Sequence, residues 1–149
     1  MNQSLTKKQF FILMKLVYLG NWIVNAFNIK QDEEYEQVED LIFKMAQIYG
    51  FDRYVDHVEK DGSSYYPTSY FEHETDVMEL IEKYDDESFW DELIHRMAER
   101  DFYKKYSKEE NAKMRREEFF KKLGELEDKY GKEFNKYGLK RLEIKKENK

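Results

Sequence analysis

The chain has 149 residues, of which 40% are hydrophobic, 17% aromatic and 39% charged, and its formal net charge at pH 7 is −6. One domain over residues 1–149 is the simplest organisation for this length, and the many Phe and Tyr side chains bring enough apolar area for its core. Because there is no cysteine, the sequence excludes disulfides, thiol nucleophiles and thiolate metal sites, and it fits a reducing cytoplasm.

Two helices are predicted in the first 50 residues. The first begins at Thr6, where Thr-Lys-Lys-Gln has the pattern of a capping box, and it runs to about Asn28. The second begins near Asp32, carries apolar residues at helical spacing, and ends at Gly50, where a glycine suits a C-terminal cap.

The segment 51–71 has a weaker pattern. Phe51, Tyr54, Val55 and Val58 fit a short helix. Equally, Asp61-Gly62 is a turn signal that fits a small β-hairpin around residues 54–66, with Val58 and Tyr65 in its two strands. Pro67 then marks a break.

Helical spacing returns from Val77 onwards. Asp85 and Asp86 suit the start of a further helix, because the helix N-terminus favours negative charge. Ser107-Lys-Glu-Glu is another capping box, and a long helix through residues 119–137 ends at Gly138. Leu142 and Ile144 either form a short C-terminal strand or simply pack against the domain. The prediction is therefore a mainly α, single-domain bundle of five to six helices.

The first helix has two unlike halves on a helical wheel. Its apolar half consists of Ile12, Leu13, Leu16, Val17, Leu19, Ile23, Val24 and Phe27, and the other half holds Lys15, Tyr18, Asn21, Trp22, Asn25 and Asn28. A lipid-facing helix does not carry a lysine and three asparagines in one stripe, and the apolar run is too short to span a bilayer. No small-residue cleavage site follows the run, so we expect neither a membrane span nor a signal peptide.

Two interpretations of the polar half remain open. In one, the helix is buried on most sides and its lysine and asparagines form a structural hydrogen-bond network. In the other, Tyr18, Asn21, Trp22 and Asn25 form a partner-binding surface, since Tyr and Trp dominate protein interfaces. The aromatic stripe of the last helix also allows two interpretations: it packs within the domain, or it supports a homodimer. The first helix is the other candidate for such a homodimer contact.

One motif in the sequence has a spacing associated with metal chemistry. Glu92-Leu-Ile-His95 has the spacing used in di-metal helical bundles, but those sites need a second copy, which this sequence lacks. The motif also lies opposite the apolar residues of its own helix, so it indicates a solvated face. We therefore expect no cofactor, no metal and no catalytic residues, with a small metal- or carboxylate-dependent enzyme as the alternative.

The distribution of charge carries more information than any motif. Residues 30–103 contain 22 acidic and 7 basic side chains, a net charge of −15, whereas residues 104–149 contain 10 acidic and 16 basic side chains, a net charge of +6. One interpretation is that the acidic and basic parts pair with each other across the folded domain. In another, the acidic part receives a basic protein partner, with Asp85, Asp86 and Glu87 as steering charges. The basic part is interrupted by glutamates, so nucleic-acid binding is the weaker alternative.

The sequence thus predicts a protein-binding or regulatory module with an acidic surface, and no membrane association.

Overall fold

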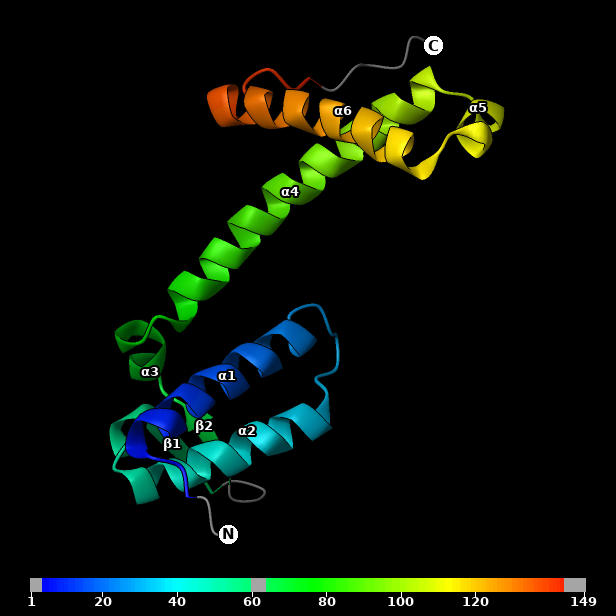
Figure 1. Cartoon of the computed structure of the whole chain (residues 1–149). Helices are drawn as coiled ribbons and strands as arrows, with labels where there is room; N and C mark the ends of the chain where they lie inside the picture. The colour runs from blue at the N-terminus through cyan, green and yellow to red at the C-terminus, as the bar shows by residue number, and fades with distance from the viewer. Residues whose placement is uncertain (1–3, 60–63, 144–149) are drawn as a thin grey trace. The chain divides into compact units, whose positions relative to one another are not determined.

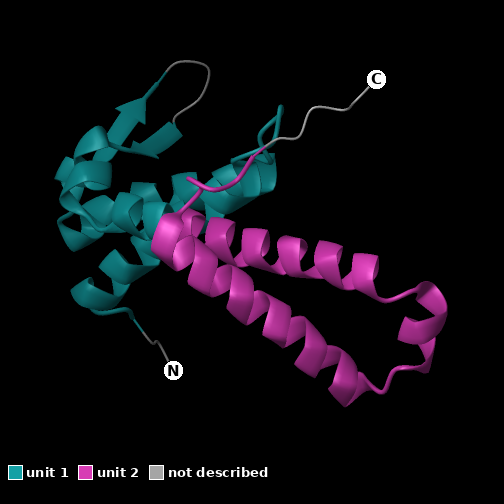
Figure 2. Ribbon diagram, turned by 90° about the horizontal axis from the view of Figure 1, so that it is seen from above, with its two compact units in different colours: residues 1–83 teal, residues 84–149 magenta. Residues whose placement is uncertain are grey.

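The computed structural model describes residues 4–59 and 64–143. Within these ranges the protein is mainly α, with six α-helices, two short 3-10 helices and one two-stranded antiparallel hairpin (Figure 1). It divides into two compact units, residues 1–83 and 84–149 (Figure 2). The predicted fold class is confirmed. None of the helices in the described ranges has the length and apolar character needed to cross a bilayer.

The first unit begins with helices α1, Lys7–Asn25, and α2, Glu33–Met45. Thr6 caps α1 through the predicted capping box, in which Thr6 Oγ1 accepts from Gln9 N and Gln9 Oε1 accepts from Thr6 N. Asp32 caps α2, as predicted, by accepting from Glu34 N. The two helices pack against each other along their lengths.

Two short 3-10 helices follow, η1 at Ala46–Tyr49 and η2 at Asp52–Tyr54. Gly50 ends η1 with φ +70°, a left-handed conformation that glycine adopts without strain, so the predicted glycine cap is present. The predicted hairpin is confirmed as β1, Val55–Val58, paired with β2, Ser64–Pro67, although its predicted turn at Asp61 and Gly62 lies outside the described residues. Helix α3, Ser69–Glu74, follows β2.

Helix α4 is continuous from Val77 to Lys105. The predicted start of a new helix at Asp85 and Asp86 is therefore wrong. No glycine or proline interrupts this segment, and Asp86 Oδ1 accepts a hydrogen bond from Trp90 Nε1 at 3.2 Å, one turn later, instead of capping backbone amides.

The second unit is a helical hairpin. Ser107 caps α5, Lys108–Lys113, through the predicted capping box, and α6 runs from Arg116 to Tyr137. Helix α6 packs antiparallel to the second half of α4, since Trp90 contacts Phe134 while Phe102 contacts Phe119 (Figure 2). Gly138 ends α6 with φ +55°. No strand follows it in the described residues: Leu142 lies after a turn, and Ile144 lies outside the described ranges.

Each unit has its own core. In the first unit, aromatic rings interlock at its centre, where Phe43 and Tyr18 each meet Phe71 edge to face. In the second unit, Ala98, Phe102 and Leu123 form a buried cluster, and Phe134 is buried as well.

The side of helix α1 that is most buried in the first core is not the apolar half of the helical wheel. Phe10 and Met14 are fully buried and Tyr18 nearly so, whereas Leu16 and Ile23 of the apolar half are 61% and 58% exposed. The polar half of the wheel thus faces the core of the first unit, and part of the apolar half faces away from this core.

Candidate functional site

The polar stripe of α1 forms a hydrogen-bond network inside the first unit. Tyr18 Oη donates to Glu72 Oε1 of α3 at 2.8 Å. Asn21 Nδ2 donates to Glu39 Oε2 of α2 at 2.9 Å, and Asn25 Nδ2 donates to Asn21 Oδ1 at 2.7 Å. The stripe therefore joins α1 to α2 and α3, which is the arrangement that the structural interpretation of the sequence predicts.

The other predicted partner-binding residues lie in different surroundings. Trp22 is half-buried and packs against the first core. Asp85, Asp86 and Glu87 are exposed on α4, in the segment assigned to the second unit. The structure thus brings Tyr18, Asn21 and Asn25 together, and a partner-binding role for the whole set stays a prediction.

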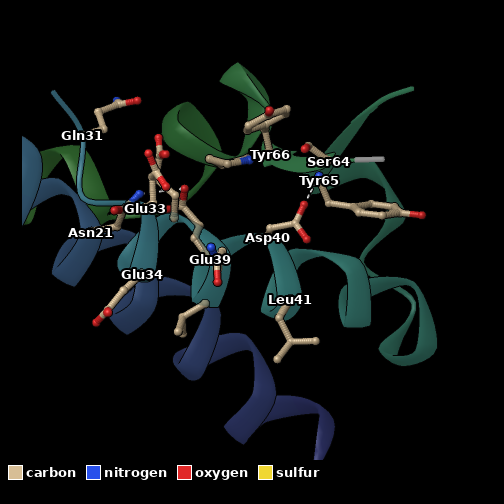
Figure 3. Close-up of a pocket in the computed structure, with 14 residues that line it drawn as sticks. Asn21, Gln31, Glu33, Glu34, Glu39, Asp40, Leu41, Ser64, Tyr65 and Tyr66 are labelled. Atoms are coloured by element: carbon tan, nitrogen blue, oxygen red, sulfur yellow. Dashed lines mark hydrogen bonds between the residues drawn. The ribbon is translucent and has the colours of Figure 1, made fainter. Parts of the chain in front are cut away.

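A surface concavity of the first unit lies between α2 and β2, with a volume of about 950 Å³. We call it the acidic groove (Figure 3). It is lined by Asn21, Gln31, Glu33, Glu34, Glu36, Gln37, Val38, Glu39, Asp40, Leu41, Ser64, Tyr65, Tyr66 and Pro67. Five of these 14 side chains are carboxylates, and none of the described lining residues is Lys, Arg or His.

Local structure explains why the groove forms. In the helical repeat of α2, Glu33, Glu36 and Asp40 fall on neighbouring positions of one face. Asp40 Oδ1 accepts a hydrogen bond from Tyr65 N at 2.6 Å, which fixes β2 beside that face (Figure 3). The carboxylates of α2 therefore form one wall of the groove, and strand β2 forms the other.

Glu39 has the most perturbed carboxyl group of the groove. Its pKa is raised to about 7, mainly because burial disfavours the charged form; the hydrogen bond from Asn21 opposes this shift, and the negative charges of Glu36 and Glu72 add to it. At neutral pH this carboxyl group is therefore divided between its protonated and charged forms. Burial together with the neighbouring Glu72 also raises the pKa of Tyr18 well above its ordinary value.

The remaining wall offers aromatic and apolar surface. Tyr66 is 47% exposed and Tyr65 is half-buried, and both line the groove together with Pro67 and Leu41. A tyrosine ring beside carboxylates attracts cations, because the face of the ring carries partial negative charge.

The two residues of the Glu92 and His95 motif contact different side chains. His95 Nδ1 lies 2.8 Å from Glu127 Oε1 of α6, and this hydrogen bond raises the pKa of His95. Glu92 instead pairs with Arg96 at 2.5 Å. No group of three or more His, Cys, Asp or Glu side chains within residues 4–59 and 64–143 is placed to hold a metal ion.

The acidic groove was not among the sites predicted from the sequence. Its carboxylates were visible only as part of the acidic middle of the chain, and the signal that could have identified them is the helical spacing of Glu33, Glu36 and Asp40. The contribution of Tyr65 and Tyr66 depends on a contact across 25 residues, which no local pattern indicates.

Comparison with known proteins adds no assignment: no protein-family model, curated protein or solved structure matches this chain.

Proposed function

We propose that the protein is a binding module whose acidic groove receives a lysine- or arginine-rich segment of a partner protein. The observation that carries this proposal is the composition of the groove: five carboxylates and two tyrosines, without a basic side chain among the described lining residues.

The charge of the groove suits a flexible basic segment. A single exposed ion pair contributes only about 0–1 kcal/mol, so one lysine would bind weakly. Several carboxylates along one wall allow several cations of one segment to bind together. The net charge of −15 over residues 30–103 would in addition accelerate the approach of a basic partner.

The uncharged residues of the groove suit the rest of such side chains. Lys and Arg carry long apolar stems, which pack on apolar surface while the charged end stays near water. Leu41 and Pro67 offer that surface, and Tyr66 offers a ring face for a cation. The five carboxylates would repel a small acidic ligand.

Of the residues predicted from sequence, Asn21 lies in the groove itself. Asp85, Asp86 and Glu87 stay in the proposal as steering charges, acting on the rate of association. We place this binding in the cytoplasm, which fits the absence of cysteine.

The test is fluorescence anisotropy with a labelled 12-residue peptide of alternating Lys and Ala. The proposal predicts saturable binding that weakens steeply between about 20 and 300 mM salt, since salt screens exposed charges. The same peptide with Glu in place of Lys should not bind.

A charge-matched pair of variants separates the groove from net charge. Glu33→Gln/Glu36→Gln should weaken binding about tenfold or more. Glu117→Gln/Glu125→Gln removes the same charge from exposed positions of α6 and should leave binding within twofold. Equal weakening by both pairs would mean that the peptide responds to overall charge, and the groove proposal would fail.

A second candidate, a carboxylate-dependent enzyme, is favoured by Glu39. A carboxyl group with a pKa of about 7 in a concave site is suited to general acid–base catalysis. A panel of chromogenic esters and glycosides tests it: turnover that Glu39→Gln abolishes would support this candidate, and no turnover by the wild-type chain would remove it.

A further inference from the structure

Glu39 is a half-buried carboxyl group that borders the acidic groove and is held there by neutral amides. Its Oε2 atom accepts from Asn21 Nδ2 at 2.9 Å, and both side chains line the groove (Figure 3). Asn21 Oδ1 in turn accepts from Asn25 Nδ2 at 2.7 Å. None of the ion pairs within residues 4–59 and 64–143 includes Glu39. Within this part of the chain, therefore, no ion pair compensates its negative charge.

Two further carboxylates act on Glu39 with the same sign of charge. Glu36 lies one turn earlier on α2, and Glu72 of α3 accepts from Tyr18 Oη of α1 at 2.8 Å. Burial and these two negative charges favour the protonated form of Glu39, whose pKa is raised to about 7. The other titratable or charged groups on this side of the groove are Asp40 on α2, Tyr65 and Tyr66 on β2, and, against the Tyr65 ring, His57 of β1 and Lys44 of α2.

From this cluster we infer that a Lys or Arg cation of the bound segment replaces the proton of Glu39, so that binding in the acidic groove releases a proton. The inference rests on the proposed function, because it concerns the same groove and the same basic ligand. In the exchange the O–H bond of the Glu39 carboxyl group breaks, its proton passes to the buffer, and the carboxylate pairs with the ammonium or guanidinium group. One positive charge enters as another leaves, so the net charge of the site is conserved.

The geometry of the carboxyl group leaves one oxygen for the ligand. Oε2 accepts from Asn21, whereas Oε1 accepts from no described residue and is the atom to which an N–H donor of the ligand can bind. An opposite charge within about 4–6 Å favours the ionised form of a carboxyl group. The bound cation therefore lowers the pKa of Glu39 towards its ordinary value of 4.5, and the proton leaves at neutral pH.

The direction and the size of the pH dependence follow from this exchange. Protons compete with the ligand for the carboxyl group, so the affinity increases as the pH rises. A group with a pKa of about 7 that loses its proton on binding makes the dissociation constant about tenfold larger at pH 6 than at pH 8. At pH 7 about half of the molecules carry the proton, so binding releases about half a proton for each ligand.

The test is the affinity of the full chain for the 12-residue Lys-Ala peptide at pH 6 and at pH 8, at one ionic strength. The peptide is acetylated and amidated and carries a rhodamine label, so that none of its groups titrates in this range. Fluorescence anisotropy should give a dissociation constant about tenfold larger at pH 6. Calorimetric titration at pH 7, in two buffers of different ionisation enthalpy, should show the release of about half a proton.

Three variants assign the proton. Glu39→Gln keeps an oxygen that accepts from Asn21 but cannot ionise, so its binding should be independent of pH and should release no proton. Glu34→Gln removes an exposed carboxylate of the same groove and should keep the tenfold ratio. His57→Gln should keep it as well. This control is needed because histidine changes its charge between about pH 5 and 8, and the His57 ring stacks on Tyr65 with a centroid distance of 4.4 Å.

The opposite outcomes overturn the inference. Wild-type binding that is equally tight at pH 6 and pH 8 would keep the groove as a binding site but remove the proton exchange. A pH dependence that persists in Glu39→Gln, or that disappears in His57→Gln, would assign the proton to another group. Absence of saturable binding at both pH values would remove the proposed function itself, and the proton exchange with it, so the two failures are distinguishable.

Discussion

The pKa of Glu39 makes stability depend on pH in a defined direction. The group has a pKa of about 7 in the folded protein against an ordinary value of 4.5, so the folded state binds its proton more tightly than the unfolded chain does. Its stabilising contribution is therefore fully present below pH 4.5 and is lost as the pH rises through about 7.

The size of the effect follows from the same two values. The interval from 4.5 to about 7 corresponds to about 3 kcal/mol at 1.36 kcal/mol for each tenfold change in proton affinity. Because the side chain is only half-buried, solvent screening reduces this to about 1–2 kcal/mol.

Urea unfolding of the wild-type chain and of Glu39→Gln at pH 5 and pH 8 measures the contribution of Glu39 to the free energy of unfolding. The difference in unfolding free energy between the two proteins should change by about 1–2 kcal/mol from pH 5 to pH 8, with the wild-type chain losing stability relative to the variant. Glu34→Gln, which removes an exposed carboxylate of the same helix, should show no such change. If Glu39→Gln and wild type respond identically to pH, or if NMR titration gives Glu39 a pKa near 4.5, the reasoning is refuted.

Three further predictions concern single contacts. Tyr18→Phe removes the hydrogen bond to Glu72 but keeps the buried ring, so the unfolding free energy should fall by about 1–2 kcal/mol in denaturant titration, and an unchanged value would mean that this bond adds no stability. Glu127→Gln should lower the pKa of His95 towards its ordinary value of 6.5, measured by NMR of the imidazole, and an unmoved pKa would contradict the assigned cause. Gly138→Ala should destabilise by about 1–2 kcal/mol in thermal unfolding, because φ is +55° there, whereas Gly124→Ala, inside α6 with open space around the added Cβ, should be neutral or stabilising; equal effects would refute the argument.

The ends of the helices were predictable from the sequence because their signals are local. Thr6, Asp32 and Ser107 each bond to backbone amides two or three residues away, and Gly138 supplies the backbone conformation that ends α6. The false start at Asp85 and Asp86 has the opposite origin. An acidic pair is also stable inside a helix when it is exposed, and nothing in the neighbouring residues distinguishes the two positions.

The orientation of α1 was not predictable from its own residues. The polar half of the wheel also carries Phe10 and Met14, so the wheel does not identify which side is buried. Which side of α1 is buried depends on hydrogen-bond partners that are distant in the sequence, because Glu72 accepts from Tyr18 and Glu39 accepts from Asn21. The acidic groove was missed for the same reason, because its second wall reaches α2 through the contact between Asp40 and Tyr65.

The most direct test of the binding proposal is an NMR titration of the isotopically labelled full chain with the Lys-Ala peptide. The account predicts that amide chemical shifts change in a single saturable process, concentrated in residues 33–41 and 64–67, the two walls of the groove. Shift changes centred on other segments, or small changes spread over all exposed acidic residues, would contradict the acidic groove as the binding site.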